Sequence, residues 1–204
     1  MLRKAIKIFL SLILLSVATF ANADEGTVRV TMATSQGDIE IDLYLDKAPI
    51  SAGNFLRLVD GARLDGSRFY RVVTYENDNG NPKIEVIQGG FGDEGESPFA
   101  PIDHETTEQT GILHKDGVMS MARGDVGTAT SEFFICLGDQ PGLDYGNRRN
   151  PDMQGFAAFG QVASGMDVVR RINHSPADAP SESDYTKGQI LTEPVEIVSV
   201  RRTN

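Results

Sequence analysis

The 204-residue chain contains no tryptophan and only one cysteine, Cys136. A single cysteine excludes both an internal disulfide and a cysteine-based metal cluster. Because Cys136 lies within the apolar segment Phe133–Leu137, we expect a buried and inert thiol. The chain also has only three histidines, and His104, His114 and His174 are not spaced as metal ligands. We therefore expect no metal site.

The chain also lacks an excess of basic residues: 19 lysines and arginines face 29 acidic residues, which gives a formal net charge of -10. Binding to phosphate groups needs a basic excess, so we expect neither nucleic acid nor an anionic membrane as a partner. The composition is 40% hydrophobic, with 21 glycines and 9 prolines. It excludes a disordered chain, a coiled coil and a collagen-like fibre, and it fits a single domain.

The N-terminus has the pattern of a leader peptide. An apolar run from Ile8 to Phe20 follows a basic start and is too short to span a membrane comfortably. It ends at Ala21-Asn22-Ala23, the small-x-small pattern at which secretory signal peptides are cleaved. We predict that residues 1–23 are a signal peptide and that residues 24–204 form the mature domain. The mature chain would be periplasmic or secreted, without membrane contact.

Alternating apolar and polar residues predict most of the structure as β-strands. Val28–Met32 and Ile39–Leu43 alternate on either side of a Ser35-Gln36-Gly37 turn, which predicts an antiparallel hairpin. Six more strands are predicted, at Arg68–Val73, Lys83–Gln88, Val118–Arg123, Phe133–Leu137, Phe156–Val162 and Val195–Arg201. Eight antiparallel strands most simply close into a barrel, because closure removes the exposed edges.

Two segments have helical periodicity instead. Pro49–Val59 carries apolar residues at helical spacing, with Ser51 as a candidate N-cap and Gly61 as a stop. Met166–Asn173 has an acidic residue early and two arginines late, as the helix dipole favours. The predicted fold is mainly β: a closed eight-stranded antiparallel barrel capped by two short α-helices. Surface loops are predicted at Thr74–Pro82, Asp144–Gly155 and Ser175–Pro194.

Two segments resemble known ligand-binding motifs, but the residues around them do not fit such sites. Gly90–Gly95 matches the dinucleotide fingerprint, but the following Glu96–Pro101 cannot open a helix under a pyrophosphate. Glu76–Asn81 resembles the start of a calcium loop, but its spacing is wrong and the closing glutamate is missing. No Gly-x-Ser-x-Gly elbow is present for serine hydrolysis.

Arg71 is the unusual residue of the third predicted strand. Strict alternation places its guanidinium on the same strand face as Phe69 and Val73. A charged side chain rarely lies among apolar ones unless it is paired or binds a desolvated group. Taken alone, Arg71 is more simply a structural partner of one of the 29 acidic residues.

The segments around Arg71 resemble, in order and spacing, the cyclophilins, a family of peptidyl-prolyl cis-trans isomerases. The resemblance extends from about Val28 to Val200 and rests on Phe69–Val73, Ile87–Gly90, Ser120–Arg123, Phe133–Cys136 and Leu143–Asp144. It implies a closed barrel capped by two helices and isomerisation of X–Pro bonds without metal or cofactor. The implied substrates are proline-containing polypeptides, unfolded or exported. Nothing in the sequence demands more than a monomer.

The resemblance also implies roles for single residues. Arg71 matches the catalytic arginine, and Gln88 matches the glutamine that orients it and the substrate. The implied substrate-binding residues are Phe134 and Leu143 as pocket walls, Val86 where the family usually has Met, Phe156 where a His is frequent, and Ala122 and Arg123 on the strand that pairs with the substrate backbone.

Several positions depart from the family pattern. Tyr70 stands where many members have His, Arg123 replaces a common Asn, and Glu132 replaces a common Gln. Gly142 stands where members sensitive to the drug cyclosporin often carry Trp, which argues against tight binding of that drug.

The segment Thr74–Pro82 is an insertion relative to the family. The family's pocket phenylalanine then falls on Glu85 or on Tyr75. Because Ile84 and Val86 share one predicted strand face, alternation favours an outward Glu85 and a Tyr75 that closes the pocket and binds substrate.

Two other classes of function compete with an isomerase. The same pocket, with its altered edge, could hold proline segments without turnover, as a binding module or chaperone. A barrel that binds a small apolar ligand would need an empty interior. The large inward residues predict a filled interior instead: Ile39, Ile41, Leu43, Phe133 and Ile135.

Overall fold

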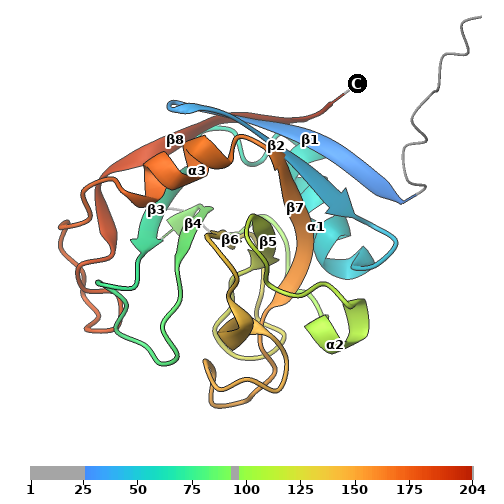
Figure 1. The fold of residues 1–204 in the computed structure, drawn as a ribbon. Coiled ribbons are helices and arrows are strands. Elements are labelled where there is room, and N and C mark those ends of the chain that lie inside the picture. Colours follow the sequence, from blue (N-terminus) through green and yellow to red (C-terminus); the bar gives the residue numbers. More distant parts are fainter. Residues whose placement is uncertain (1–25, 93–96, 204) are drawn as a thin grey trace, which may run out of the picture.

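The strands close into the barrel that the alternation predicts. The computed structural model describes residues 26–92 and 97–203, and the predicted signal peptide lies outside these ranges. The strands are β1 (Thr27–Thr34), β2 (Gly37–Tyr44), β3 (Arg68–Val73), β4 (Val86–Gly90), β5 (Val118–Met121), β6 (Phe133–Cys136), β7 (Ala157–Ser164) and β8 (Ile190–Arg202). They pair antiparallel in the closed order β1-β2-β7-β5-β6-β4-β3-β8 (Figure 1). The predicted fold class is confirmed.

Several predicted strand ends are wrong. For β4 the reason is a contact with the preceding loop, which the alternation of neighbouring residues does not reveal. β4 begins at Val86 rather than at Lys83. The backbone N–H of Ile84 donates to the carboxylate of Asp78 at 2.8 Å, so this part of the chain is held by the preceding loop. β5 ends at Met121, two residues before the predicted end, and β8 begins at Ile190 rather than at Val195.

In the part of the chain that the structure describes, three α-helices accompany the barrel: α1 (Pro49–Asp60), α2 (Thr107–Thr110) and α3 (Met166–Asn173). α1 and α3 are the two predicted helices, and they lie on different sides of the barrel (Figure 1). α2 is too short for its periodicity to be recognised, and a capping box between Thr106 and Gln109 holds it. A 3₁₀ turn, η2 (Pro141–Leu143), precedes the second of the predicted surface loops, Asp144–Gly155.

The prediction that Ser51 caps α1 is wrong. The N-cap is Ala48, which provides no side-chain hydrogen bond, and the hydroxyl of Ser51 is buried without a partner. The carboxylate of Glu105 accepts instead from the backbone N–H groups of Ile50 and Ser51, at 3.0 and 2.7 Å. An anion satisfies the free N–H groups at a helix start. Gly61 ends the helix as predicted.

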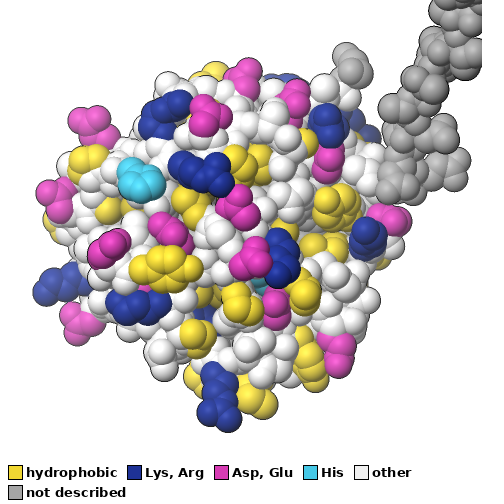
Figure 2. Space-filling model, in the orientation of Figure 1, with side chains coloured by type: hydrophobic (Ala, Val, Ile, Leu, Met, Phe, Trp, Pro, Cys, Tyr) yellow, Lys and Arg dark blue, Asp and Glu magenta, His cyan; other side chains and the backbone are white. Residues whose placement is uncertain are grey.

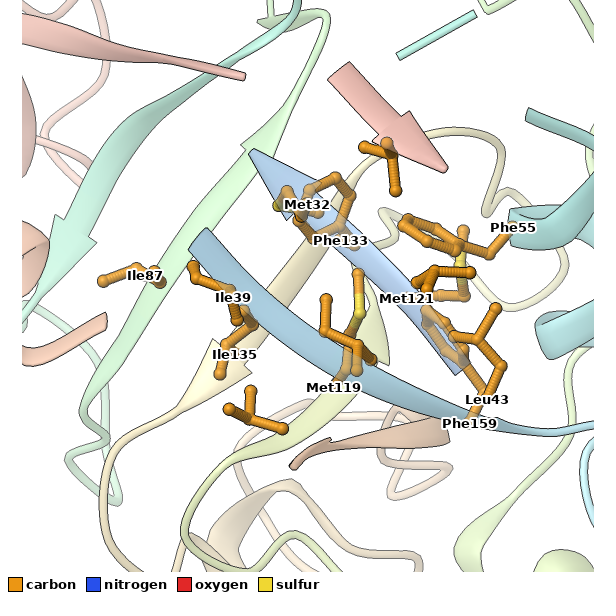
Figure 3. Packing of buried hydrophobic residues seen from close by; sticks show 14 of the residues in the cluster. Met32, Ile39, Leu43, Phe55, Ile87, Met119, Met121, Phe133, Ile135 and Phe159 are labelled. Atoms are coloured by element: carbon orange, nitrogen blue, oxygen red, sulfur yellow. The ribbon is translucent and has the colours of Figure 1, made fainter. Parts of the chain in front are cut away.

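Aromatic and aliphatic side chains fill the inside of the barrel (Figure 3). The ring of Phe133 packs edge-on against Phe55 at 5.4 Å and against Phe69 at 5.7 Å. Phe159 packs on the other side of Phe55 at 5.4 Å. This filled interior agrees with the expectation that argued against a ligand-binding barrel. Cys136 is buried and free, and burial raises the pKa of its thiol well above the ordinary value.

The surface of the described chain carries charged side chains of both signs (Figure 2). On the face that Figure 2 shows, basic and acidic side chains are interspersed rather than gathered by sign. Within residues 26–92 and 97–203, the helices are all too short or too polar to cross a membrane.

A buried ion pair connects the loops that follow β3 and η2. Arg149 and Asp78 form two hydrogen bonds at 2.7 and 2.8 Å, and their side chains are 2% and 0% exposed. Arg149 also donates to the carbonyl of Pro82 and to the hydroxyl of Tyr185, which lies in the loop before β8. Asn79 donates to two carbonyls of that same loop. The three predicted surface loops are therefore fastened to one another.

We expect Asp78→Asn to lower the free energy of unfolding by about 3–5 kcal/mol, because it leaves the buried guanidinium of Arg149 without its counter-charge. Burial alone would raise the pKa of Asp78, but hydrogen bonds from Arg149, Gly80 and Ile84 hold it below its ordinary value. Such a carboxyl stabilises the fold above its unfolded pKa of about 4, and this contribution is lost as the pH falls through the folded pKa. Denaturant titrations from pH 7 to pH 3 measure both effects.

The matched control is Asp65→Asn, which removes a surface pair with Arg201. This variant is expected to cost less than about 1 kcal/mol. Equal small losses in both variants would show that the Asp78 pair does not hold the loops.

Candidate functional site

Arg71 lies on the outer face of β3, where a bulge changes the direction of its side chain. The pairing of β3 with both β4 and β8 shifts register between Phe69 and Arg71. Phe69 and Val72 consequently pack inside the barrel, whereas Val73 belongs to an apolar cluster outside it. The prediction that Arg71 shares a face with Phe69 is therefore wrong, because an inserted residue reverses the alternation.

Two uncharged amides hold the guanidinium of Arg71. Its Nη1 donates to Oε1 of Gln88 at 2.8 Å, and its Nε and Nη2 donate to Oε1 of Gln189 at 3.0 and 2.6 Å. A guanidinium has five N–H donors, so one N–H on each Nη remains for another acceptor. Within residues 26–92 and 97–203 no carboxylate pairs with Arg71, so this part of the chain does not contain the ion-pair partner that the simpler interpretation expected.

The described contacts consequently orient the charge of Arg71 without neutralising it. Burial lowers the pKa of Arg71 below its ordinary value, and the nearby tyrosines Tyr185 and Tyr70 oppose this shift. The Tyr185 ring lies 5.5 Å from the guanidinium carbon, within range of a cation–π contact. The group stays protonated, because the ordinary pKa of arginine is so high.

Gln88 is itself oriented by a chain of hydrogen bonds. Its Nε2 donates to the hydroxyl of Tyr70 at 2.7 Å, and that hydroxyl donates to Glu132 at 2.5 Å. Burial, followed by the charge of Glu132, raises the pKa of Tyr70 far above its ordinary value, so the hydroxyl remains a donor. The two departures from the family pattern at positions 70 and 132 are thus in direct contact.

An apolar cluster lies beside Arg71, outside the barrel. Gln88 is the register partner of both Arg71 on β3 and Phe134 on β6, so the three residues form a row across neighbouring strands. The cluster comprises Val73, Ile84, Val86, Phe134, Cys136 and Leu143, with Ala122 and Phe156 packed against it. The structure therefore brings together the predicted wall residues. The rings of Phe134 and Phe156 meet edge-on at 5.4 Å.

Arg123 supports this cluster rather than projecting from it. Its side chain is 1% exposed and forms two hydrogen bonds with Asp152. It also donates to the carbonyl of Gly155 and lies 5.2 Å from the Phe156 ring. Ala122 and Arg123 follow the end of β5, and their pairing with a substrate backbone stays a prediction.

The uncertain pocket edge is resolved in favour of an outward Glu85. Burial raises the pKa of Glu85, and the charges that act on it are His174 and Glu76, not Arg71. Tyr75 is 47% exposed and lies outside the apolar cluster, with its hydroxyl accepting from Gln140 at 3.3 Å. Tyr75 therefore lies at the rim, and its role in binding stays a prediction. Ile84, 7% exposed, occupies the cluster instead.

The insertion also explains Gly142. A Cβ atom at this position would lie 2.6 Å from Cγ of Pro82, the last residue of the inserted segment. The tryptophan that cyclosporin-sensitive members of the resembled family often carry here has no room. Pro82 of the insertion therefore occupies the space into which a side chain at position 142 would extend.

A buried histidine lies beneath the cluster. His114 stacks on Phe134 at 5.9 Å, and its Nδ1 and Nε2 lie 2.8 and 3.0 Å from Asp144 and the hydroxyl of Ser120. Burial lowers the pKa of His114, so we infer a neutral ring with its proton on Nδ1 toward the carboxylate. Ser120 is fully buried, so this array is structural support and not a nucleophile. No three His, Cys, Asp or Glu side chains of the described ranges form a metal site.

Sequence comparison places the chain among isomerases. A family model described as cyclophilin type peptidyl-prolyl cis-trans isomerase/CLD matches residues 29–202. A relative from Acinetobacter baylyi, named peptidyl-prolyl cis-trans isomerase, is 35% identical over 201 residues, covering 97% of this chain and 95% of its own. A relative from Dickeya dadantii, named peptidyl-prolyl cis-trans isomerase A, is 34% identical over 162 residues, covering 78% of this chain and 79% of its own.

Solved structures share the fold. A cyclophilin-type isomerase of Cryptosporidium parvum matches with a TM-score of 0.65 and 18% identity, over 87% of this chain and 98% of that chain. A structure of that protein in the presence of the dipeptide Ala-Pro matches with a TM-score of 0.65 and 21% identity, over 86% of this chain and 99% of that chain.

Gln189 is the site residue that the sequence analysis missed, and we expect Gln189→Leu to lower kcat/KM for proline isomerisation about 10- to 100-fold, mainly through kcat. The side chain is fully buried, and its loss would free two N–H groups of Arg71 to move. A proline-isomerisation assay measures the rate, and the NMR signal of the Arg71 Nε–H reports whether the group is still held.

The control is Asn54→Leu, which removes another buried amide, on α1, that donates to the carbonyl of Thr130. It is expected to lower stability but to leave kcat/KM and the Arg71 signal unchanged. If both variants reduce activity equally, Gln189 contributes only to stability.

Proposed function

The chain belongs to the cyclophilin-type peptidyl-prolyl cis-trans isomerases and shares their activity, and on this premise we propose that Arg71 catalyses the isomerisation of X–Pro bonds in exported polypeptides. The observation that carries the proposal is the guanidinium of Arg71, which two amides hold beside an apolar cluster. No carboxylate of the described residues pairs with this guanidinium. Family membership favours turnover over the alternative of a non-catalytic proline-binding module.

Rotation about a peptide bond is slow because resonance gives the C–N bond partial double-bond character, with a barrier of about 18–20 kcal/mol. In the twisted transition state this resonance is lost, and the prolyl nitrogen becomes pyramidal and gains a lone pair. An enzyme accelerates the rotation by binding this twisted form better than the planar ones. Shortening an isomerisation from ~100 s to ~1 ms asks for about 7 kcal/mol of such preference.

The residues of this site have the chemistry needed to bind the twisted X–Pro bond better than the planar ones. A free N–H of Arg71 can donate to the prolyl nitrogen or to the adjoining carbonyl as the bond twists. Gln88 and Gln189 hold the donor in place beforehand, so no reorganisation is needed during the reaction. Ala122 and Phe156, which are half-buried and pack on the cluster of Phe134 and Leu143, offer apolar surface for the proline ring. No bond is made or broken, so the proposed mechanism requires neither nucleophile nor cofactor.

We expect Arg71→Ala to fold but to lose at least ~100-fold in kcat/KM, the scale of removing one preorganised donor. A protease-coupled assay on a proline peptide measures the rate, and circular dichroism with a thermal melt verifies the fold. Arg71→Lys keeps the charge but not the planar fork, so it should recover only part of the loss. Arg29→Ala, which breaks an exposed pair between Arg29 of β1 and Asp42 of the neighbouring β2, is the control.

Activity close to that of the unaltered protein in Arg71→Ala would remove the guanidinium from the mechanism. If Arg71→Ala unfolds, the decision passes to Arg71→Lys, and full activity in that variant would equally contradict the proposal.

The exported setting rests on the leader pattern alone. Residues 1–23 combine a basic start, a short apolar centre and Ala21-Asn22-Ala23, which supports cleavage before Asp24. The proposed substrates are accordingly polypeptides that fold after export, where slow X–Pro isomerisation limits folding.

Expression of the full chain in a bacterial host, followed by cell fractionation and N-terminal sequencing, tests this setting. The expected product begins at Asp24 and leaves the cytoplasm. Replacing Ala21 and Ala23 with bulky residues should block cleavage, because signal peptidase requires small side chains there. A cytoplasmic protein that retains Met1 would contradict export but would leave the isomerase assignment intact.

A further inference from the structure

A cavity of about 530 Å³ adjoins Arg71 on the side of β3 that faces β8. Arg71 and Gln88 line it, so it is continuous with the catalytic residues proposed above. The apolar cluster of Phe134 and Leu143 lies across β4 and β6, on the other side of Arg71. A polypeptide substrate extends from its proline in both directions. When the proline binds at the apolar cluster, a substrate residue on one side of it can therefore reach this cavity.

Rings and apolar side chains form one part of the cavity lining, and polar or charged side chains form the rest. Tyr70 and Phe91 contribute aromatic rings, and Pro180, Ile190 and Pro194 contribute apolar surface. Arg68 and Arg71 also line it and face a single carboxylate, Glu182, so the lining has one excess positive charge and disfavours a lysine side chain. Flat apolar surfaces of this kind suit an aromatic or large aliphatic side chain.

A carboxylate fixes the aromatic wall of the cavity. Glu132 accepts hydrogen bonds from the backbone N–H groups of Phe91 and Gly92 at 2.7 and 3.2 Å, and from the hydroxyl of Tyr70 at 2.5 Å. All three donor residues line the cavity. Gly90 has φ 141°, and a side chain there would collide with the Glu132 carboxylate.

The chemistry of these bonds explains why a carboxylate suits this position. An ionised carboxylate only accepts hydrogen bonds, and its two oxygens serve three donors here. A glutamine would present an NH₂ group to one side of the same donors. Glu132 and Tyr70, two of the departures from the family pattern, therefore act together in building one wall.

We propose that this cavity is a specificity subsite for an aromatic or large aliphatic side chain next to the proline of the substrate, with Glu132 as the residue that positions its wall. The proposal rests on the isomerase function proposed above and adds a substrate preference to it. The preference should exist at one flank of the proline only, because the cavity lies on one side of Arg71.

A panel of proline peptides tests the subsite, with Ala, Leu, Phe, Lys or Glu placed either directly before or directly after the proline. The unaltered protein should favour Phe and Leu over Ala at one flank and show no such preference at the other. Phe91→Ala should reduce kcat/KM for the Phe peptide about five- to tenfold more than for the Ala peptide. Phe99→Ala is the matched control, because Phe99 is equally half-buried but packs under Arg57 of α1.

Glu132→Gln tests the positioning role. Its Phe-to-Ala ratio should fall in the same direction as in Phe91→Ala, which a purely structural loss would not produce, since that would slow both peptides alike. Equal rates for Ala and Phe at both flanks in the unaltered protein would overturn the subsite. So would a ratio that Phe91→Ala leaves unchanged. If no peptide of the panel is isomerised, the proposed function itself fails, which is a distinguishable result.

Discussion

The site depends on one constraint: the guanidinium of Arg71 must be held rigidly without being neutralised. A carboxylate would hold it more strongly, because its negative charge adds Coulomb attraction to the hydrogen bonds. It would also cancel the positive charge that the twisted prolyl bond needs. Amide oxygens from Gln88 and Gln189 take three of the five N–H groups and leave the charge intact. The cost of burying this cation is visible in the direction of its pKa, which burial lowers.

The inserted segment after β3 is a structural part of this arrangement and not a spacer. Asn77 accepts through its carbonyl from Nε2 of Gln189 at 2.8 Å, so the insertion orients the second amide. The next residue, Asp78, forms the buried pair with Arg149, whose guanidinium also contacts Tyr185. In Figure 1 the loops after β3 and before β8 lie side by side, as the hydrogen bonds between Asn79 and the later loop require. The loops thus surround Arg71 from the β8 side.

Local patterns in the sequence predicted the barrel and the core of the site, and non-local contacts account for the errors. Alternation and helical periodicity are properties of neighbouring residues, which is why β3 and α3 have the predicted bounds. Ser51 failed as a cap because the true acceptor, Glu105, is 54 residues away. Arg71 was placed on the wrong face relative to Phe69 because a bulge reverses the alternation. Gln189 carries no motif, and only the folded chain brings it to Arg71, 118 residues earlier.

The most direct test of the central claim is the isomerisation rate of Gln189→Glu. The substitution keeps an acceptor at the same place for Nε and Nη2 of Arg71 but gives it a negative charge. The account predicts that Arg71 stays in place, as its Nε–H NMR signal would report, while kcat/KM falls by at least about tenfold because the charge is neutralised. A Gln189→Glu variant that holds Arg71 and isomerises proline peptides as fast as the unaltered protein would contradict the account.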